Sequence, residues 1–184
     1  MAGQDLRDDI AAHVGAQLEG LAERGVWACG NACASVLLVK GRLSEVDKSQ
    51  APASLLTGAD GKALRAALAA LGYAPEDWAG LACCRVDGTP LEPRLLREAV
   101  TGLDPATVVV LDDDAANAFR EAYADELAAL PSFDEAMLTE GLVSHVLGMR
   151  VLNVGNFEDS LASDAEKQRS WAYLKRIPPM GEPY

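Results

Sequence analysis

The sequence is short of basic residues, of histidine and of long apolar runs. It has 16 Lys and Arg against 28 Asp and Glu, which gives a formal net charge of −12. Because nucleic-acid affinity comes mainly from neutralising phosphates, this charge opposes strong non-specific binding to DNA or RNA. No run of about 18 apolar residues occurs, so we expect no membrane span. The two histidines, His13 and His145, fall in segments predicted to be helical and are expected to be ordinary helix residues.

Cysteine is scarce too, and its four positions are Cys29, Cys33, Cys83 and Cys84. Residues 1–14 are polar and acidic, unlike a secretory signal, so the expected location is cytoplasmic. Disulfides are not expected in that compartment. The plain interpretation of these cysteines is small buried residues. The other interpretation is a redox or metal site built from all four.

Charge is unevenly distributed along the chain. Residues 112–140 hold nine acidic side chains and one basic side chain, Arg120. Residues 165–176 hold one acidic side chain and four basic ones, namely Lys167, Arg169, Lys175 and Arg176. The second stretch predicts a local basic surface on an otherwise acidic body. These four residues are the candidate nucleic-acid contacts, and any DNA binding is expected to be weak.

Apolar strands alternate with helices along the whole chain. Strands are predicted at 34–39, 80–86, 107–112 and 149–155, and helices at 4–24, 61–73, within 89–103, 113–130, 132–148 and about 164–176. Strands that are apolar along their length predict a parallel sheet covered on both faces. We therefore expect an α/β protein, a three-layer α/β/α sandwich with a four-stranded parallel sheet. It forms one domain over residues 1–184, with an N-terminal helix within 1–25 and a C-terminal tail at 177–184.

The loops that follow the predicted strands carry a set of spaced motifs. After the first strand comes KGRLSEVDKSQ, and then LTGADGKAL at 56–64 with Gly58 and Gly61. The later motifs are ACCRVDGTPLEPRLL with Cys84, Arg85, Thr89 and Pro90, then VVVLDDDAANAF, and finally RVLNVGNFEDSL followed by Trp171 and Leu174. In order and spacing, residues 36–176 resemble the uracil-DNA glycosylase superfamily, most closely its iron–sulfur branch. The resemblance implies the fold of that superfamily and excision of a base from DNA.

Several positions depart from the family pattern where the chemistry would lie. The first loop lacks the family's acidic residue and proline, and Glu45 and Asp47 are its nearest carboxylates. Leu56 stands where the family stacks uracil on a phenylalanine, and Asn156 stands where it has a histidine. Asn156 can donate a hydrogen bond but cannot transfer a proton. Catalytic candidates implied by the resemblance are Asn156, Glu45 and Asp47, and substrate-binding candidates are Gly41, Arg42, Leu56, Gly58, Asn156 and Phe157.

The cysteines match the family's cluster ligands only in part. Cys84 is in register with one ligand, and Val100 stands near the position of the next. A [4Fe–4S] cluster needs four thiolates. We therefore expect no cofactor, and Cys29, Cys33, Cys83 and Cys84 would be metal ligands only if a cluster were present.

The triplet Asp112–Asp114 has two interpretations. Adjacent carboxylates suit a divalent metal, but no further oxygen ligands are evident in the other loops. An aspartate at a helix start accepts hydrogen bonds from free N–H groups and complements the helix dipole. In the resembled family this slot is a strand-to-helix turn, and we favour the capping interpretation.

These observations leave four functional hypotheses. The favoured one is a divergent uracil-DNA glycosylase-like protein that has lost ordinary uracil excision and acts as a binding protein or on an unidentified substrate. The alternative is an active DNA glycosylase, an N-glycosidic hydrolase with non-standard catalytic residues. The third is a redox or metal protein that uses the cysteines. The last is an α/β domain that binds a small-molecule or protein ligand, because such sheets host many chemistries.

Overall fold

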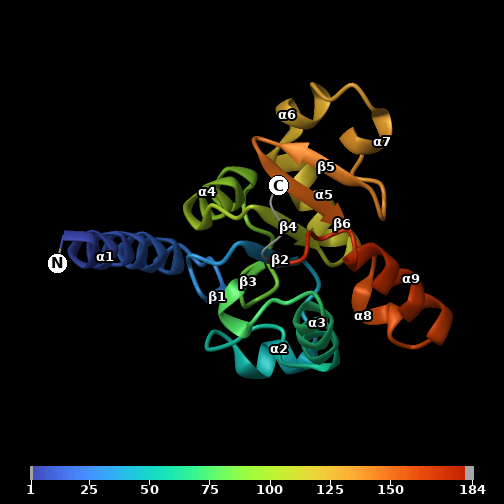
Figure 1. Ribbon diagram of the computed structural model, residues 1–184, viewed down its shortest axis with the longest axis horizontal. Coiled ribbons are helices and arrows are strands. Elements are labelled where there is room, and N and C mark those ends of the chain that lie inside the picture. The colour runs from blue at the N-terminus through green and yellow to red at the C-terminus, as the bar shows by residue number, and fades with distance from the viewer. Residues whose placement is uncertain (1, 181–184) are drawn as a thin grey trace.

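The computed structural model describes residues 2–180, which build a six-stranded mixed sheet of order β1-β3-β2-β4-β6-β5 (Figure 1). The strands are β1 Ala28–Gly30, β2 Val36–Lys40, β3 Trp78–Ala82, β4 Thr107–Val110, β5 Val143–Val146 and β6 Met149–Asn153. The inner four are mutually parallel, and β1 and β5 run antiparallel at the two edges. The α/β prediction is confirmed. The predicted four-stranded parallel sheet needs correction, because the two edge strands make it six-stranded and mixed.

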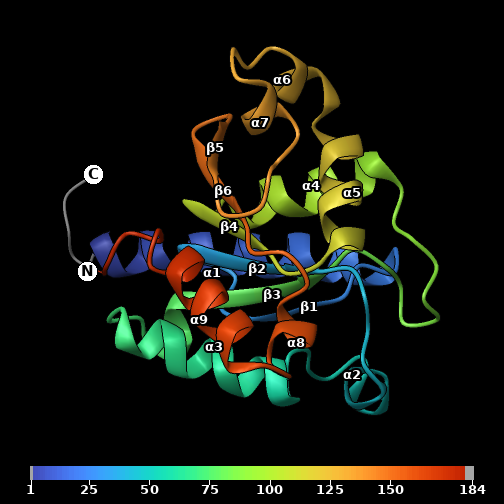
Figure 2. The same cartoon turned by 90° about the vertical axis from the view of Figure 1, so that its right-hand side faces the viewer.

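Helices cover both faces of the sheet because successive strand residues point to opposite sides. Along β2, Leu37 and Val39 join one apolar core, whereas Val36 and Leu38 join the other. The first core is covered by α1 Ala2–Glu23, α4 Pro93–Leu103 and α5 Asp113–Ala122, and the second by α3 Ala59–Ala70, α8 Phe157–Ser160 and α9 Asp164–Leu174. Figure 2 shows α4 and α5 on the side of β2 and β3 that is opposite to α3 and α8.

Two predicted helices are shorter than expected. The segment 113–130 divides at Tyr123 into α5 and α6 Ala124–Ala128. The segment 132–148 is not one helix but α7 Phe133–Ala136 followed by β5. Leu138 and Gly141 have φ angles of 51° and 77°, which break the helical path. Valines 143 and 146 then continue as a strand, the conformation that β-branched side chains favour.

The predicted N-terminal helix is present as α1, which extends away from the body in Figure 1. Leu21 at its C-terminal end is buried in the first core, and Gly25 turns the chain with a φ of 90°. Within residues 2–180, we find no helix that is both long and apolar enough to cross a membrane.

The predicted C-terminal tail packs against the body as far as the structure describes it. Ile177 is buried, the Tyr73 hydroxyl donates to the Pro178 carbonyl at 2.5 Å, and the Met180 N–H donates to the Leu71 carbonyl at 3.1 Å. The rest of the predicted tail, residues 181–184, lies outside the described residues.

The strand order creates a switch point beside β2. The chain passes from β2 to β3 on one side and later to β4 on the other. In open α/β sheets, ligands bind outside the carboxyl ends of the strands at such a point. Lys40 ends β2, and Asp112 lies just beyond the end of β4. The topology therefore directs attention to the loops that begin at these two residues.

Candidate functional site

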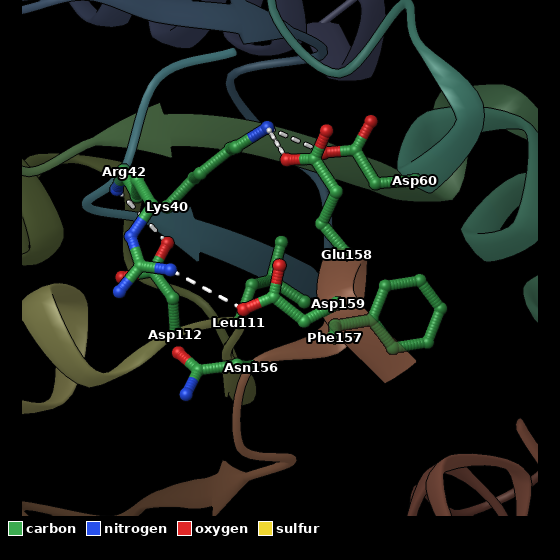
Figure 3. A pocket seen from close by; sticks show the side chains of 9 residues that line it. All are labelled: Lys40, Arg42, Asp60, Leu111, Asp112, Asn156, Phe157, Glu158 and Asp159. Carbon is green, nitrogen blue, oxygen red and sulfur yellow. Dashed lines mark hydrogen bonds and ion pairs between the residues drawn. The ribbon is translucent and has the colours of Figure 1, made fainter. Parts of the chain in front are cut away.

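A polar cavity lies at this switch point (Figure 3). Its volume is about 20 Å³, room for about one water molecule. Its walls come from the ends of β2, β4 and β6 and from the starts of α3 and α8. The lining residues are Lys40, Arg42, Asp60, Leu111, Asp112, Asn156, Phe157, Glu158 and Asp159. Four of these side chains are acidic and two are basic, so the cavity is anionic.

Lys40 lies at the centre of the cavity wall. Its ammonium donates to Asp47 at 2.6 Å, to Asp60 at 2.5 Å and to Glu158 at 3.2 Å (Figure 3 draws the last two). The side chains of Lys40, Asp47 and Asp60 are at most 3% exposed, whereas Glu158 is 44% exposed. An ammonium has three N–H donors. All three are therefore used inside the protein, and Lys40 has none left for a ligand.

The ion pairs hold both Lys40 and Asp47 in their charged forms. Burial alone would lower the pKa of Lys40, but its bonds to Asp47 and Asp60 outweigh burial and raise that pKa. Burial alone would raise the pKa of Asp47, but hydrogen bonds from Lys40 and Ser44 outweigh it and lower that pKa. A deprotonated carboxylate is available for catalysis only if its oxygens are free. Asp47 does not meet that condition, because its oxygens also accept from the Ser44 hydroxyl and from the N–H groups of Ser44 and Leu56.

The lowered pKa of Asp47 predicts how the stability of the protein changes at acid pH. Its folded pKa lies below its unfolded value of about 4, so Asp47 contributes stability above that value and loses it as the pH falls through the folded pKa. We expect Asp47→Asn to destabilise the protein more at about pH 6 than at about pH 3. Urea unfolding of both proteins at both pH values measures this difference. An equal loss at the two pH values would contradict the assignment.

The raised pKa of Lys40 affects the stability of the protein at alkaline pH. Its stabilising contribution is complete below the unfolded pKa of about 10.4 and is lost only as the pH rises through the higher folded pKa. The ion pair between Lys40 and Asp47 is therefore intact across neutral pH.

Asp112 caps helix α5 and also binds the loop that follows β2. The cap decides between the two interpretations of the aspartate triplet. Its carboxylate accepts from the Ala115 N–H at 2.8 Å, as the N-cap of α5. It also accepts from the N–H of Gly41 at 3.0 Å and from the N–H of Arg42 at 2.9 Å. Asp112 is 5% exposed. The capping interpretation is confirmed, and the same carboxylate fixes the loop after β2 onto α5.

Gly41 is required where this loop meets α5. A Cβ atom at Gly41 would lie 2.4 Å from the backbone nitrogen of Ala115. Any larger residue would push the loop away from Asp112. The predicted binding residue Gly41 thus brings the two backbones together, and it also lines a second pocket beside Cys84 with a volume of about 390 Å³.

The Asn156 side chain is hydrogen-bonded to the start of α5. Its amide NH2 donates to the Asp113 carboxylate at 2.8 Å, and its amide oxygen accepts from the Asp113 N–H at 3.2 Å. Both functional ends of the amide therefore bind one residue. Asn156 lines the cavity, but its hydrogen-bonding groups are directed to Asp113.

The charged side chains at the mouth of the cavity are exposed and form weak ion pairs. Arg42 is 54% exposed and lies 3.3 Å from Asp159 and 3.9 Å from Asp114, which are 70% and 61% exposed. Exposed pairs of this kind contribute about 0–1 kcal/mol. A ligand can displace them at little cost. The predicted binding residue Arg42 is therefore placed to contact a molecule that enters the cavity.

The structure does not bring every candidate to the cavity. Arg42, Asn156 and Phe157 line it, and Asp47 lies behind its wall through Lys40. Leu56 is fully buried in the second core, and Gly58 is the N-cap of α3.

Glu45 lies outside the cavity wall as well. Its side chain is 88% exposed on α2 Glu45–Gln50, where it pairs with Lys48 at 2.7 Å. The sheet topology thus gathers part of the predicted set and leaves Glu45, Leu56 and Gly58 in other surroundings.

The four cysteines are all free. Cys83 and Cys84 are buried, Cys29 is half-buried beside the Leu55 carbonyl, and Cys33 is exposed. Burial, aided by nearby acidic side chains, raises the pKa of Cys84 to about 11. Thiolates are the metal-binding form. The surroundings of Cys84 therefore favour the neutral thiol. Among residues 2–180, no group of three or more His, Cys, Asp or Glu side chains is placed to hold a metal ion.

The predicted basic surface is largely engaged within the chain. Lys167 pairs with Asp164 at 3.3 Å, and Arg169 lies 3.8 Å from Glu166. The two remaining basic residues are also in contact with other groups, as Lys175 lies over the Trp171 ring and Arg176 donates to the Gly141 carbonyl. The ion pairs of Lys167 and Arg169 are exposed, like those of Arg42, so a phosphate could displace them at little cost.

Three parts of the network were missed at the level of sequence: the donor role of Lys40, and the acceptor roles of Asp60 and Glu158. One signal was available for Lys40, since a lysine that continues the apolar run VLLV must find partners if it is buried. Asp60 and Glu158 gave no such signal, because their partner is separated from them by 20 and 118 residues.

Comparison with known proteins gives no family for this chain, since no protein-family model matches it and no curated protein matches it at a significant level. The case for its function therefore depends on the geometry of the cavity and on the motif resemblance.

Proposed function

We propose that the chain is a divergent uracil-DNA glycosylase-like protein that has lost ordinary uracil excision and acts as a binding protein for a small polar ligand. The proposed site is the mouth of the polar cavity at the carboxyl ends of β2, β4 and β6, where Arg42 is exposed. The main support for the proposal is that the NH2 group and the oxygen of the Asn156 amide are both hydrogen-bonded to Asp113. The amide expected to face the substrate base thus already makes two hydrogen bonds to Asp113.

The carboxylates support the same conclusion. Excision needs a polar group that holds or activates water and an environment that stabilises an anionic leaving base. Asp47 is bound to Lys40 and to the backbone, and Glu45 lies outside the cavity. A leaving uracil anion would also meet Glu158 and Asp159 at the mouth. The cavity therefore opposes charge of that sign.

A second candidate, an active glycosylase with non-standard residues, draws support from one observation. The cavity has room for about one water molecule beside Glu158, whose carboxylate is 44% exposed. A half-exposed carboxylate next to such a space is suited to positioning water. In this version Glu158, rather than Asp47, would be the water-positioning group, and Asn156 would have to leave Asp113 to reach the base.

The loss of uracil recognition is tested with single-stranded oligonucleotides that differ only in carrying uracil or thymine at one position. We expect no preference for uracil in fluorescence anisotropy, and weak binding of both that is lost as salt is raised. Free uracil should not shift the melting temperature. A clear preference for the uracil strand that disappears in Asn156→Ala would contradict the proposal and favour the active glycosylase.

A further inference from the structure

An apolar groove lies among the helices α3, α8 and α9, which Figure 2 shows on the same side of the sheet. Its volume is about 230 Å³. That volume is larger than a cavity of roughly 150 Å³ that holds one benzene ring, and smaller than the clefts of about 300–1,000 Å³ that take drug-sized molecules. The groove therefore suits a small molecule with one ring.

The walls of the groove favour an aromatic ring. Ala63 and Ala67, one turn apart on α3, are small side chains that leave the groove open. Phe157 and Leu174 are buried behind it, whereas Trp171 is half-buried. An indole that keeps part of its surface exposed can contact the ring of a ligand, and aromatic pairs add to the gain from burying apolar area.

One charged side chain, Lys167, is found among the described residues that line the groove. It is 48% exposed and gives one of its three N–H donors to Asp164 at 3.3 Å, whose carboxylate is 93% exposed. The other polar lining residue, Ser170, donates its hydroxyl proton to Ser160 at 2.9 Å and has none left for a ligand. Lys167 is thus the charged donor that the groove offers.

The charges around the groove favour an anion over a cation. Every acidic side chain of α3, α8 and α9 has a basic partner: Asp60 and Glu158 bind Lys40, Asp159 binds Arg42, Asp164 binds Lys167, and Glu166 lies near Arg169. On α3, by contrast, the Lys62 side chain makes no ion pair within residues 2–180. The Lys175 ammonium also lies 5.9 Å from the centre of the Trp171 ring. An incoming carboxylate therefore meets unpaired positive charge.

We propose that this groove binds a small aromatic carboxylate. The ring lies against Trp171 between α3 and α9, and the carboxylate accepts hydrogen bonds from the Lys167 ammonium. Its pair with Asp164 is exposed and costs little to displace, and a charge-assisted bond at the edge of an apolar groove is stronger than a neutral one. Phe157 lines both this groove and the polar cavity, so the two sites are neighbours. The proposal does not depend on which ligand the cavity takes.

The test is a titration with p-toluate, followed through the indole N–H peaks of the three tryptophans in heteronuclear NMR. The Trp171 peak, assigned by its loss in Trp171→Phe, should shift saturably. The peaks of Trp27 and Trp78, which are 2% and 7% exposed, should not move. Lys167→Met keeps an apolar stem without the ammonium and should weaken binding of p-toluate about tenfold. It should leave the weaker binding of the neutral p-toluamide unchanged.

A steric pair of variants locates the site. Ala67→Leu fills the groove and should abolish the shift, whereas Ala66→Leu adds the same side chain on the exposed face of α3 and should bind as the wild type does. Binding by Ala67→Leu equal to that of the wild type would overturn the proposal.

Wild-type protein alone decides the matter if Ala67→Leu fails to fold. Inorganic phosphate carries negative charge without a ring and should not shift the Trp171 peak. A shift as large as that with p-toluate would show a bare anion site on the surface and would contradict the proposal. Equal affinities for p-toluate and p-toluamide would contradict it too, because the ammonium of Lys167 would then have no part in binding.

Discussion

Replacing Lys40 by methionine is expected to lower the free energy of unfolding by about 3–5 kcal/mol, the cost of removing one partner from a buried charge network. Methionine keeps nearly the length of the lysine stem, so little cavity is created. The loss arises because Asp47 and Asp60 stay buried but no longer have a positive partner. Their side chains are at most 3% exposed. Urea unfolding at neutral pH measures the change.

Arg42→Met is the matched control for this experiment. Arg42 is the other cation at the cavity, but it is 54% exposed and its acidic partners are more exposed still. Its replacement should change the free energy of unfolding by no more than about 1 kcal/mol. Adding Asp47→Asn and Asp60→Asn to Lys40→Met should restore part of the lost stability. A loss below about 1 kcal/mol for Lys40→Met alone would mean that the network does not hold the site together.

The second large effect is expected for Asp112→Ala, at about 3 kcal/mol. Removal of an N-cap costs about 1 kcal/mol, and each buried N–H left without an acceptor costs a further 1–3 kcal/mol. The cap bond is the one to the Ala115 N–H, and the N–H groups of Gly41 and Arg42 add about 1 kcal/mol each, the low end of that range, because they are only partly buried. Asp112→Asn keeps one acceptor oxygen and should lose less.

The neighbouring aspartate gives the control for Asp112. Asp114 is 61% exposed in the first turn of α5, and its ion pair with Arg42 is long. Asp114→Ala should therefore stay within about 0.5 kcal/mol of wild type. Similar losses for the two alanine variants would show that general charge at the helix start, and not the cap of Asp112, determines stability.

The central part of the fold was predictable because its signals are local. The run VVVL predicted β4, and the aspartates after it predicted the start of α5. Apolar runs also located β2, β3 and β6 to within a few residues. The helix predicted within 89–103 is α4, and Pro93 lies in its first turn, a position that proline favours. In each case, neighbouring residues contain enough information to determine the local backbone.

The edge strand β5 was not predictable in the same way. A helix does begin at the start of the predicted segment, where the Ser132 side chain caps α7 by accepting from the Glu135 N–H. That helix ends after one turn, because the chain must turn back to pair with β6, a contact between segments that local spacing does not reveal. The left-handed conformation of Leu138, which makes the turn, is rare for leucine and has no sequence signal.

The site was predictable only in outline. The positions of Arg42, Asn156 and Phe157 follow from the rule that ligand sites form at the carboxyl ends of strands. The assignment of chemical roles required the partners of each side chain. Whether Asn156 faces a substrate or Asp113 depends on a contact between residues 43 positions apart. Tertiary contacts of this range determine which groups remain free.

The measurement that tests the central claim most directly is single-turnover excision, with protein in large excess over a single-stranded oligonucleotide that carries one uracil. The Asn156 amide is hydrogen-bonded to Asp113, and the Asp47 carboxylate is paired with Lys40. We therefore expect an intact strand, with no abasic product above the protein-free rate. Abasic product formed well above that rate, and abolished by Asn156→Ala, would contradict the account. It would show that Asn156 leaves Asp113 and that the excision chemistry has been kept.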